Sequence, residues 1–359
     1  MNGRFIPFLF MVIVLAACKK EKDGQPSPPV PVVAPEIVSY KFKGQSPVIN
    51  LSATERKIEA RFPATLLSGN GLIAEYQLTT GANVTVDGLL QSSGITTNNF
   101  DRELSYQVKN TAGTINTWKV LATNNSYSYD WELGCFVSKE KSNDRPYEWY
   151  YDQGITGIYS SVNCGPSSVT AAIKWADQSF SHPPEYARNF YGTSGGWWFT
   201  NDIMAYLNQH SIPQAALALG TTPALTWDKI IRQVDQGRVV ILCLDMHLVR
   251  SAASENHGRV NKFYSTTPSW GHFVVVKGYR EVDNMKYYEI YDPFTFGKRN
   301  SDDNTLKGRG RFYRYDDIYM ATSHWWNFAI TVNPKGVVID PGTFRMALDP
   351  ATIPNAKGR

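Results

Sequence analysis

The sequence predicts an α+β domain preceded by a small all-β sandwich domain, and three features of the chain lead to this prediction. Residues 36–125 consist of short strand-like segments separated by turn residues, without helical periodicity. Residues 126–333 begin with segments of helical periodicity and continue with long apolar strands, the order typical of an α+β domain. The length of 359 residues is sufficient for two such domains.

The composition is that of a globular protein. Hydrophobic residues make up 42% of the chain and charged residues 19%, so the chain can bury a core. The formal net charge is +4 at pH 7, but lysine and arginine form no dense cluster. We therefore expect no nucleic-acid partner.

Residues 1–17 have the features of a targeting segment, with a positive start and an apolar run too short to span a bilayer. Leu15-Ala16-Ala17 directly precedes Cys18, and small residues in this position resemble the cleavage signal of bacterial lipoproteins. The resemblance implies that Cys18 becomes the lipid-modified N-terminus. Residues 18–35 would then form a charged, Pro-rich tether. The alternative is a plain signal peptide in which Cys18 is incidental.

A lipid anchor of this kind would make the membrane a partner of the protein and place it in the cell envelope. The outer membrane is the favoured location, and exposure at the cell surface stays open. The oligomeric state also stays open, because nothing in the sequence indicates it.

The sandwich is predicted by alternating polarity in residues 36–125. Ile37–Phe42 alternates, and residues 105–109 and 118–123 have the pattern of two strands of a hairpin. The segment resembles the immunoglobulin-like modules common near the N-terminus of Bacteroidetes surface lipoproteins. It contains no cluster of catalytic residue types, so a spacer role is favoured over ligand binding.

The second part of the chain predicts helices first and strands afterwards. Helices are expected from Cys164 onwards, over residues 201–209, and from Thr226 as N-cap to residue 236. The expected strands cover residues 238–245, 272–279 and 286–291, the last two forming a hairpin. Residues 334–359 are expected to form a loosely ordered C-terminal tail.

Cys164 is expected at the start of a helix. The apolar residues Val169, Ala172 and Ile173 follow it at the spacing of one helical face, and Pro166 suits a first helical turn. The free N–H groups and the dipole at a helix N-terminus favour negative charge, so a thiol there is biased towards the reactive thiolate. The alternative is a small buried side chain, because free cysteine is among the most buried residue types.

A thiolate nucleophile needs a base and a group that orients the base. His272 opens the expected strand 272–279, and Asp292 follows the end of the next strand. Because the two strands form an antiparallel hairpin, Asp292 should lie beside His272 and accept a hydrogen bond from one ring nitrogen. Taken alone, His272 could be a core histidine and Asp292 a turn former. Together with Cys164 they predict a Cys-His-Asp triad.

The remaining cysteines and histidines predict no metal site. CxxC and His-x-x-x-His spacings are absent, so zinc is not expected, and nothing implies another cofactor. Cys135 and Cys243 lie in strand-like apolar runs, and the sequence leaves open whether they form a disulfide.

Three segments resemble a known family, and they are Asn163-Cys164-Gly165-Pro166, residues 271–279 and Tyr291-Asp292-Pro293. They resemble the signature blocks of papain-fold cysteine peptidases, in particular the bacteriocin-processing-like (C39-like) group, over residues 145–332. The resemblance implies a papain-like catalytic domain in residues 126–333.

In that family the cysteine is the nucleophile, the histidine is the base and the aspartate orients the histidine, which implies these roles for Cys164, His272 and Asp292. A glutamine upstream of the cysteine helps to bind the oxyanion, together with the cysteine N–H. Gln153 is the nearest candidate, although it precedes Cys164 by 11 residues, a longer gap than in the best-known members.

The expected function is hydrolysis of a peptide or amide bond in a peptide or protein substrate, through an acyl-thioester intermediate. One alternative is transglutaminase-like acyl transfer, which uses the same residue types in the same order. The long gap of 108 residues between Cys164 and His272 argues against it. The other alternative is a surface-binding lipoprotein without enzymatic activity. The substrate and the cleavage specificity stay open.

Overall fold

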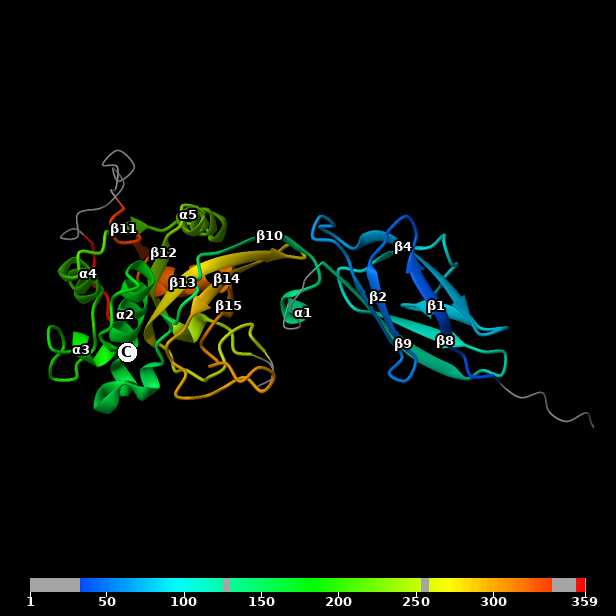
Figure 1. Cartoon of the computed structure of the whole chain (residues 1–359), viewed down its shortest axis with the longest axis horizontal. Helices are drawn as coiled ribbons and strands as arrows, with labels where there is room; N and C mark the ends of the chain where they lie inside the picture. The colour runs from blue at the N-terminus through cyan, green and yellow to red at the C-terminus, as the bar shows by residue number, and fades with distance from the viewer. Residues whose placement is uncertain (1–32, 125–129, 253–257, 338–352, 359) are drawn as a thin grey trace, which may run out of the picture.

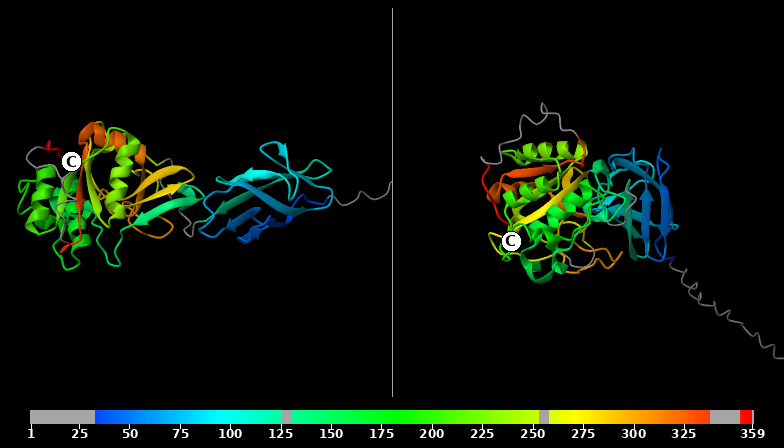
Figure 2. Two further views of the ribbon diagram at one scale, coloured as in Figure 1. Left: turned by 90° about the horizontal axis from the view of Figure 1, so that it is seen from above. Right: turned by 60° about the vertical axis from the view of Figure 1, so that its left-hand side comes forward.

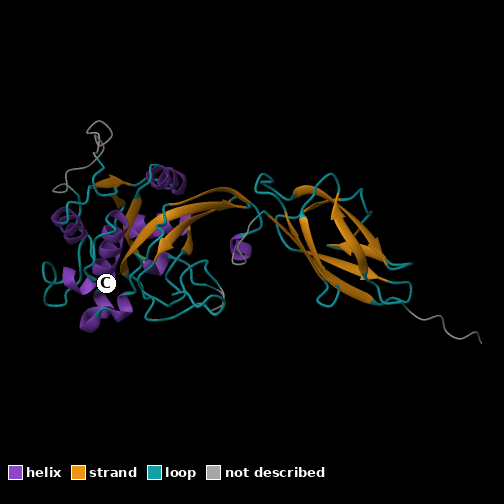
Figure 3. Cartoon of the chain, in the orientation of Figure 1, coloured by secondary structure: helices purple, strands orange, loops and turns teal. Residues whose placement is uncertain are grey.

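The computed structural model describes residues 33–124, 130–252, 258–337 and 353–358. These residues form an all-β domain followed by an α+β domain, as predicted, and the two domains lie end to end along the long axis of the molecule (Figure 1). Within the described part of the first domain, every regular element is a strand (Figure 3).

The first domain contains two sheets. One sheet has the order β1 (Ile37–Phe42), β4 (Asn70–Leu78), β7 (Thr97–Asn99). The other has the order β2 (Val48–Ser52), β3 (Lys57–Arg61), β9 (Ile115–Thr123), β8 (Leu104–Lys109), β5 (Asn83–Val86), β6 (Leu89–Leu90). Strand β3 pairs with β9 in parallel, and the other pairs are antiparallel.

The two sheets enclose one apolar core, to which both contribute side chains. In β8 the residues Leu104, Tyr106 and Val108 are buried, and the residues between them are exposed. The alternation that predicts these strands therefore also fills the core. The relation to immunoglobulin-like modules stays a prediction.

The second domain is built on a seven-stranded antiparallel sheet. Its order is β11 (Gln214–Ala218), β16 (Phe328–Val332), β12 (Val239–Asp245), β13 (Gly271–Val282), β14 (Met285–Tyr291), β15 (Arg311–Arg314), and β10 (Val137–Ser142) pairs with β13. The short helical segments are α1 (Asp130–Leu133), η1 (Gln153–Ile155), η2 (Gly157–Val162), α3 (Pro184–Ala187) and η3 (Met246–Leu248).

Longer helices cover both faces of this sheet. Helices α2 (Cys164–Ala176) and α4 (Thr200–Gln209) pack on one face, and α5 (Pro223–Asp235) and α6 (Tyr315–Trp325) pack on the other (Figure 2). In β12, Ile241 and Cys243 face the α2 side, whereas Leu242 and Leu244 face the α5 side. Because both faces are covered, every residue of β12 is buried, which explains its continuous apolar run.

Two helices differ from the prediction. Helix α5 begins at Pro223 with Thr222 as N-cap, whose hydroxyl accepts a hydrogen bond from the Leu225 N–H at 3.2 Å. The prediction of Thr226 as N-cap is wrong, because Pro223 already fits the first helical position. Helix α6 was not predicted, since its buried residues include few large apolar side chains.

Several predictions fall on residues 1–32, which lie outside the described ranges, among them the signal segment, most of the tether and Cys18. Within the described ranges, no helix is long and apolar enough to cross a bilayer. Cys135 and Cys243 are buried thiols and form no disulfide. They lie in the cores of different domains.

The turn between β13 and β14 forms a non-covalent contact between the two domains. The carboxylate of Asp283 in this turn accepts hydrogen bonds from the N–H groups of Cys135 and Phe136, the second at 2.9 Å. Cys135 and Phe136 are buried in the core of the first domain, although they follow its expected end at residue 125. The Asp283 carboxylate therefore links the sheet of the second domain to the core of the first.

We expect Asp283→Ala to destabilise the protein, because it leaves two backbone N–H groups without their acceptor. An unsatisfied buried donor costs about 1–3 kcal/mol, so the midpoint of denaturant unfolding should fall. The matched control is Glu140→Ala, which removes an exposed carboxylate on β10 that pairs with Arg280 at 3.1 Å. Surface ion pairs contribute about 0–1 kcal/mol, so the control should shift little. Equal midpoints for the two variants would contradict this role of Asp283.

Candidate active site

Cys164 is the first residue of α2, as predicted, and its side chain is fully buried. The neighbouring Gly165 lies against Trp198 so closely that an added Cβ would be 2.6 Å from the Trp198 Cβ atom. A glycine after the cysteine therefore lets the helix start approach the segment that contains Trp198.

The β13–β14 hairpin brings His272 and Asp292 together. Val275 pairs with Tyr291, so the residue that follows β14 lies near the start of β13. Nε2 of His272 is 2.8 Å from Oδ1 of Asp292, and both side chains are fully buried. The hairpin argument made from the sequence therefore gives the observed pairing of these two residues.

The surroundings of His272 favour its protonated form. Burial alone would lower the pKa of His272, but the charge and hydrogen bond of Asp292 raise it above its usual value. A negative charge on Cys164 would raise the pKa of His272 further. Nδ1 of His272 has no hydrogen-bond partner among the described residues, so this nitrogen is free to face the thiol.

Asp292 is held by further donors. Burial would raise the pKa of Asp292, but the charge and hydrogen bond of His272 keep it below its usual value. Oδ2 accepts hydrogen bonds from the hydroxyl groups of Tyr264, at 2.8 Å, and Tyr313. Oδ1 also accepts one from the N–H of Phe294 at 2.9 Å. These donors fix the carboxylate in the orientation that faces the histidine.

Gln153 is buried in η1 and is attached to the segment after Asp292, since its N–H donates to the Pro293 carbonyl at 2.9 Å. Its side-chain Nε2 donates to the Ser160 carbonyl at 2.9 Å. Its Oε1 has no hydrogen-bond partner among the described residues. One N–H of the amide is thus engaged, and the predicted oxyanion role of Gln153 stays a prediction.

Arg188 joins two loops near the cysteine. Its Nε donates to Oδ1 of Asn163 at 2.7 Å, and Nη2 donates to the Val162 carbonyl at 2.9 Å. Its Nη1 donates to the carbonyl groups of Gly192 and Gly196. The guanidinium therefore fixes the residues before Cys164 to the loop of residues 192–196.

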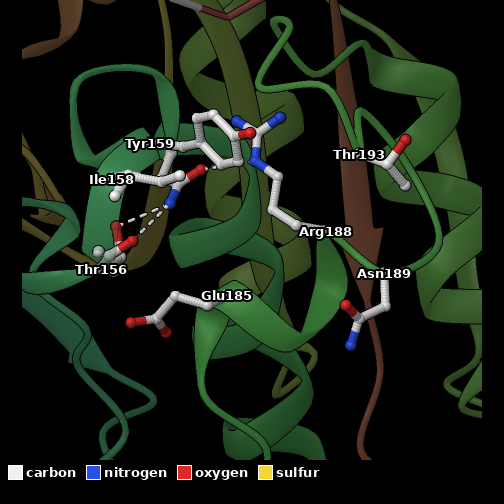
Figure 4. Close-up of a pocket in the computed structure, with 9 residues that line it drawn as sticks. Thr156, Ile158, Tyr159, Glu185, Arg188, Asn189 and Thr193 are labelled. Carbon is white, nitrogen blue, oxygen red and sulfur yellow. Dashed lines mark hydrogen bonds between the residues drawn. The ribbon is translucent and has the colours of Figure 1, made fainter.

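A pocket of about 490 Å³ adjoins Arg188, and it is lined by Thr156, Gly157, Ile158, Tyr159, Asn163, Glu185, Arg188, Asn189 and Thr193. The guanidinium carbon of Arg188 lies 5.6 Å from the centroid of the Tyr159 ring. Figure 4 shows the two side chains beside one another. Burial lowers the pKa of Arg188, whereas the charge of Cys164 opposes this shift. The lining of the pocket therefore includes a buried cation, Arg188.

Sequence reasoning missed Tyr264, Tyr313 and Arg188. Tyr264 and Tyr313 are distant in the chain from Asp292, and Arg188 is distant from Asn163. None of the three lies in a motif that marks a site. In the described ranges, no group of three His, Cys, Asp or Glu side chains is arranged to hold a metal ion.

Two solved structures with some similarity to this chain share little of its sequence. One, a protein described as a C39-like peptidase from Bacillus anthracis, has 14% identity and a TM-score of 0.32, covering 54% of this chain and 98% of that one. Another, described as a glycoside hydrolase from Bacteroides thetaiotaomicron, has 11% identity and a TM-score of 0.23, covering 88% of this chain and 99% of that one. Likenesses this weak carry no argument about function.

No curated protein matches the chain. The family model that matches is that of the Peptidase_C39 like family, over residues 145–320. Cys164, His272 and Asp292 all lie within this match. The match supports the placement of the second, α+β domain in the C39-like peptidase group.

Proposed function

We propose that the protein is an exported cysteine peptidase that hydrolyses a peptide or amide bond with Cys164, His272 and Asp292. The observation that carries the proposal is the buried 2.8 Å contact between His272 and Asp292, which leaves Nδ1 of His272 without a partner among the described residues. Cys164 supplies the nucleophile at the start of α2. The match of residues 145–320 to the Peptidase_C39 like family supports the same activity.

The reaction would begin from a thiolate on Cys164 and an imidazolium on His272. Sγ attacks the carbonyl carbon, the C–N bond breaks, and His272 gives its proton to the leaving amine. The acyl group is then held as a thioester. Water attacks the thioester carbonyl while His272 takes a proton from it, and the acid leaves as the thiolate and imidazolium are restored.

The developing oxyanion would be stabilised at the N-terminus of α2. The backbone N–H of Cys164 and the helix dipole favour negative charge at this position. The second donor would be the Gln153 amide, whose Nε2 shares one hydrogen with the Ser160 carbonyl. Asp292 would keep His272 in one orientation, with Tyr264 and Tyr313 holding the carboxylate.

The proposal includes a lipid anchor on Cys18 in the cell envelope, with the all-β domain as a spacer. The Leu15-Ala16-Ala17-Cys18 sequence supports it. Acyl transfer of the transglutaminase type and pure binding at the surface are the competing functions. A product analysis separates them, because hydrolysis releases a free acid, transfer gives a new amide and binding gives neither.

The thiol and the histidine should be coupled, which the pH dependence of Cys164 alkylation tests. The raised pKa of His272 keeps the imidazolium present from acid to neutral pH, and it is lost only as the pH rises through that raised value. We therefore expect fast alkylation well below the pH at which a free thiol, with a pKa of about 8.5, slows. In His272→Ala the profile should move towards that of a free thiol. Identical profiles for wild type and His272→Ala would remove the peptidase assignment.

Asp292→Asn should lower turnover by about 10⁴-fold, because the amide stabilises the wrong tautomer of the histidine and carries no charge. Tyr313→Phe keeps the carboxylate and should give a much smaller loss. Asp316→Asn is the matched control, since this aspartate forms an ion pair with Arg314 rather than with a triad residue, and its rate should match wild type. The measurement is hydrolysis of a fluorogenic peptide library, with stoichiometric labelling of Cys164 as the check on intact sites. A wild-type rate for Asp292→Asn would contradict the orienting role.

Lipidation is tested by growing cells with a labelled fatty acid. The wild-type protein should take up the label, and Cys18→Ser should not, because the modification requires the thiol of Cys18. Equal labelling of the two proteins would exclude the anchor.

A further inference from the structure

Residues 353–358 lie along the edge of the segment 198–200, next to the candidate site. Lys357 forms an antiparallel bridge with Phe199. The N–H of Thr200 donates to the Ala356 carbonyl at 2.8 Å, and the N–H of Gly358 donates to the Trp198 carbonyl at 2.9 Å. Segment 353–358 thus adds a strand-like edge through main-chain hydrogen bonds, which is a common way for proteins to bind extended peptides.

Two tryptophans donate further hydrogen bonds to the same segment. The indole N–H of Trp325 donates to the Lys357 carbonyl at 2.9 Å, and that of Trp326 donates to the Pro354 carbonyl at 2.5 Å. The Lys357 ammonium lies 3.8 Å from the centre of the Trp197 ring. Residues 197–200, Trp325 and Trp326 therefore surround the segment and contact its backbone and its lysine side chain, and we call this surface the groove.

The groove leads to the thiol. A Cβ atom added to Gly358 would lie 2.9 Å from Sγ of Cys164 and 2.3 Å from the Phe273 ring. A Cβ atom added to Gly271, directly before His272, would lie 2.3 Å from the Lys357 carbonyl oxygen. The close fit at both glycines lets the backbone of segment 353–358 reach the cysteine.

The direction of the segment is that of the acyl half of a substrate. Ile353 packs in the core at the start of the segment, and Gly358, its last described residue, lies against Cys164. In a peptide cleaved by a thiolate, the residues N-terminal to the attacked carbonyl run in the same sense towards the nucleophile.

We propose that residues 353–358 are an internal ligand of this groove, and that an extended peptide substrate must displace them to reach Cys164. The competition with substrate rests on the proposed peptidase function, but the occupancy of the groove does not. A tethered segment has a high effective concentration, on the order of millimolar, so modest contacts suffice to keep it bound. The segment would therefore lower access to the thiol in the resting protein.

The test is the rate of alkylation of Cys164 by iodoacetamide, followed by mass spectrometry of the peptide that contains it. Gly358→Leu should push the segment out of the groove and raise the rate by about tenfold or more, as expected for loss of a tethered ligand. Pro354→Ala is the matched control in the same segment, because that side chain is exposed and its carbonyl bond to Trp326 is retained. The control should alkylate at the wild-type rate.

A second variant, which lacks residues 353–359, should also show fast alkylation. The hexapeptide Ile-Pro-Asn-Ala-Lys-Gly, added to this variant, should slow the reaction in a concentration-dependent manner. The hexapeptide Ile-Pro-Asn-Ala-Lys-Leu, in which leucine replaces the final glycine, should not. Equal rates in wild type, Gly358→Leu and the shortened variant would overturn the proposal. Failure of the glycine hexapeptide to protect would overturn it as well.

The same comparison in a His272→Ala background separates the two proposals. Segment 353–358 makes its contacts with residues 197–200 and with the tryptophans, so protection of the thiol should persist without the histidine. If protection persists but no peptide is hydrolysed by the wild type, the groove proposal stands and the peptidase proposal fails. If the wild type hydrolyses a peptide but the segment gives no protection, the peptidase proposal stands and the groove proposal fails.

Discussion

The buried contact between His272 and Asp292 is the interaction on which the rest of the candidate site depends. The transfer of two charged groups from water into the protein interior has an unfavourable free energy unless hydrogen-bond and charge partners compensate for it. Here the carboxylate meets the imidazole ring, two tyrosine hydroxyls and a backbone N–H, so its lone pairs are occupied. The partners come from β13, β15 and the connections around them, so the sheet has to close correctly before the pair can form.

The two-faced sheet explains how the third member reaches this pair. Helix α2 packs on the face to which Cys243, Phe273 and Val275 point, and its first residue is Cys164. The opposite face is filled by α5 and α6, so the strands that carry the histidine are supported from both sides. Arg188 then joins the chain before Cys164 to the loop of residues 192–196. Rigid support on every side is what a nucleophile and its base require to keep a fixed geometry.

The parts of the site that the sequence predicts are those that depend on local patterns. The helix that begins at Cys164 could be predicted because its apolar spacing and Pro166 lie within a few residues of the cysteine. The contact of Asp292 with His272 could be predicted because a hairpin determines which strand ends come together. Tyr264, Tyr313 and Arg188 could not be predicted, because their partners are set by tertiary packing of distant segments. For the same reason residues 353–358, expected within a loose tail, instead pack beside Trp198 and Trp325. The Thr222 cap of α5 was missed because two threonines compete within five residues and Pro223 decides between them.

The hairpin of β13 and β14 contains His272 near one end and Asp283 at the other. At about 3.3 Å per residue, a strand of this length spans roughly 35–40 Å, so it extends from the site to the joint with the all-β domain. The first domain is therefore attached to the same strand that carries the histidine, through Asp283 and the N–H groups of Cys135 and Phe136. A force applied to the all-β domain would load this strand along its length, and hydrogen bonds to β10, β12 and β14 would share that load in shear.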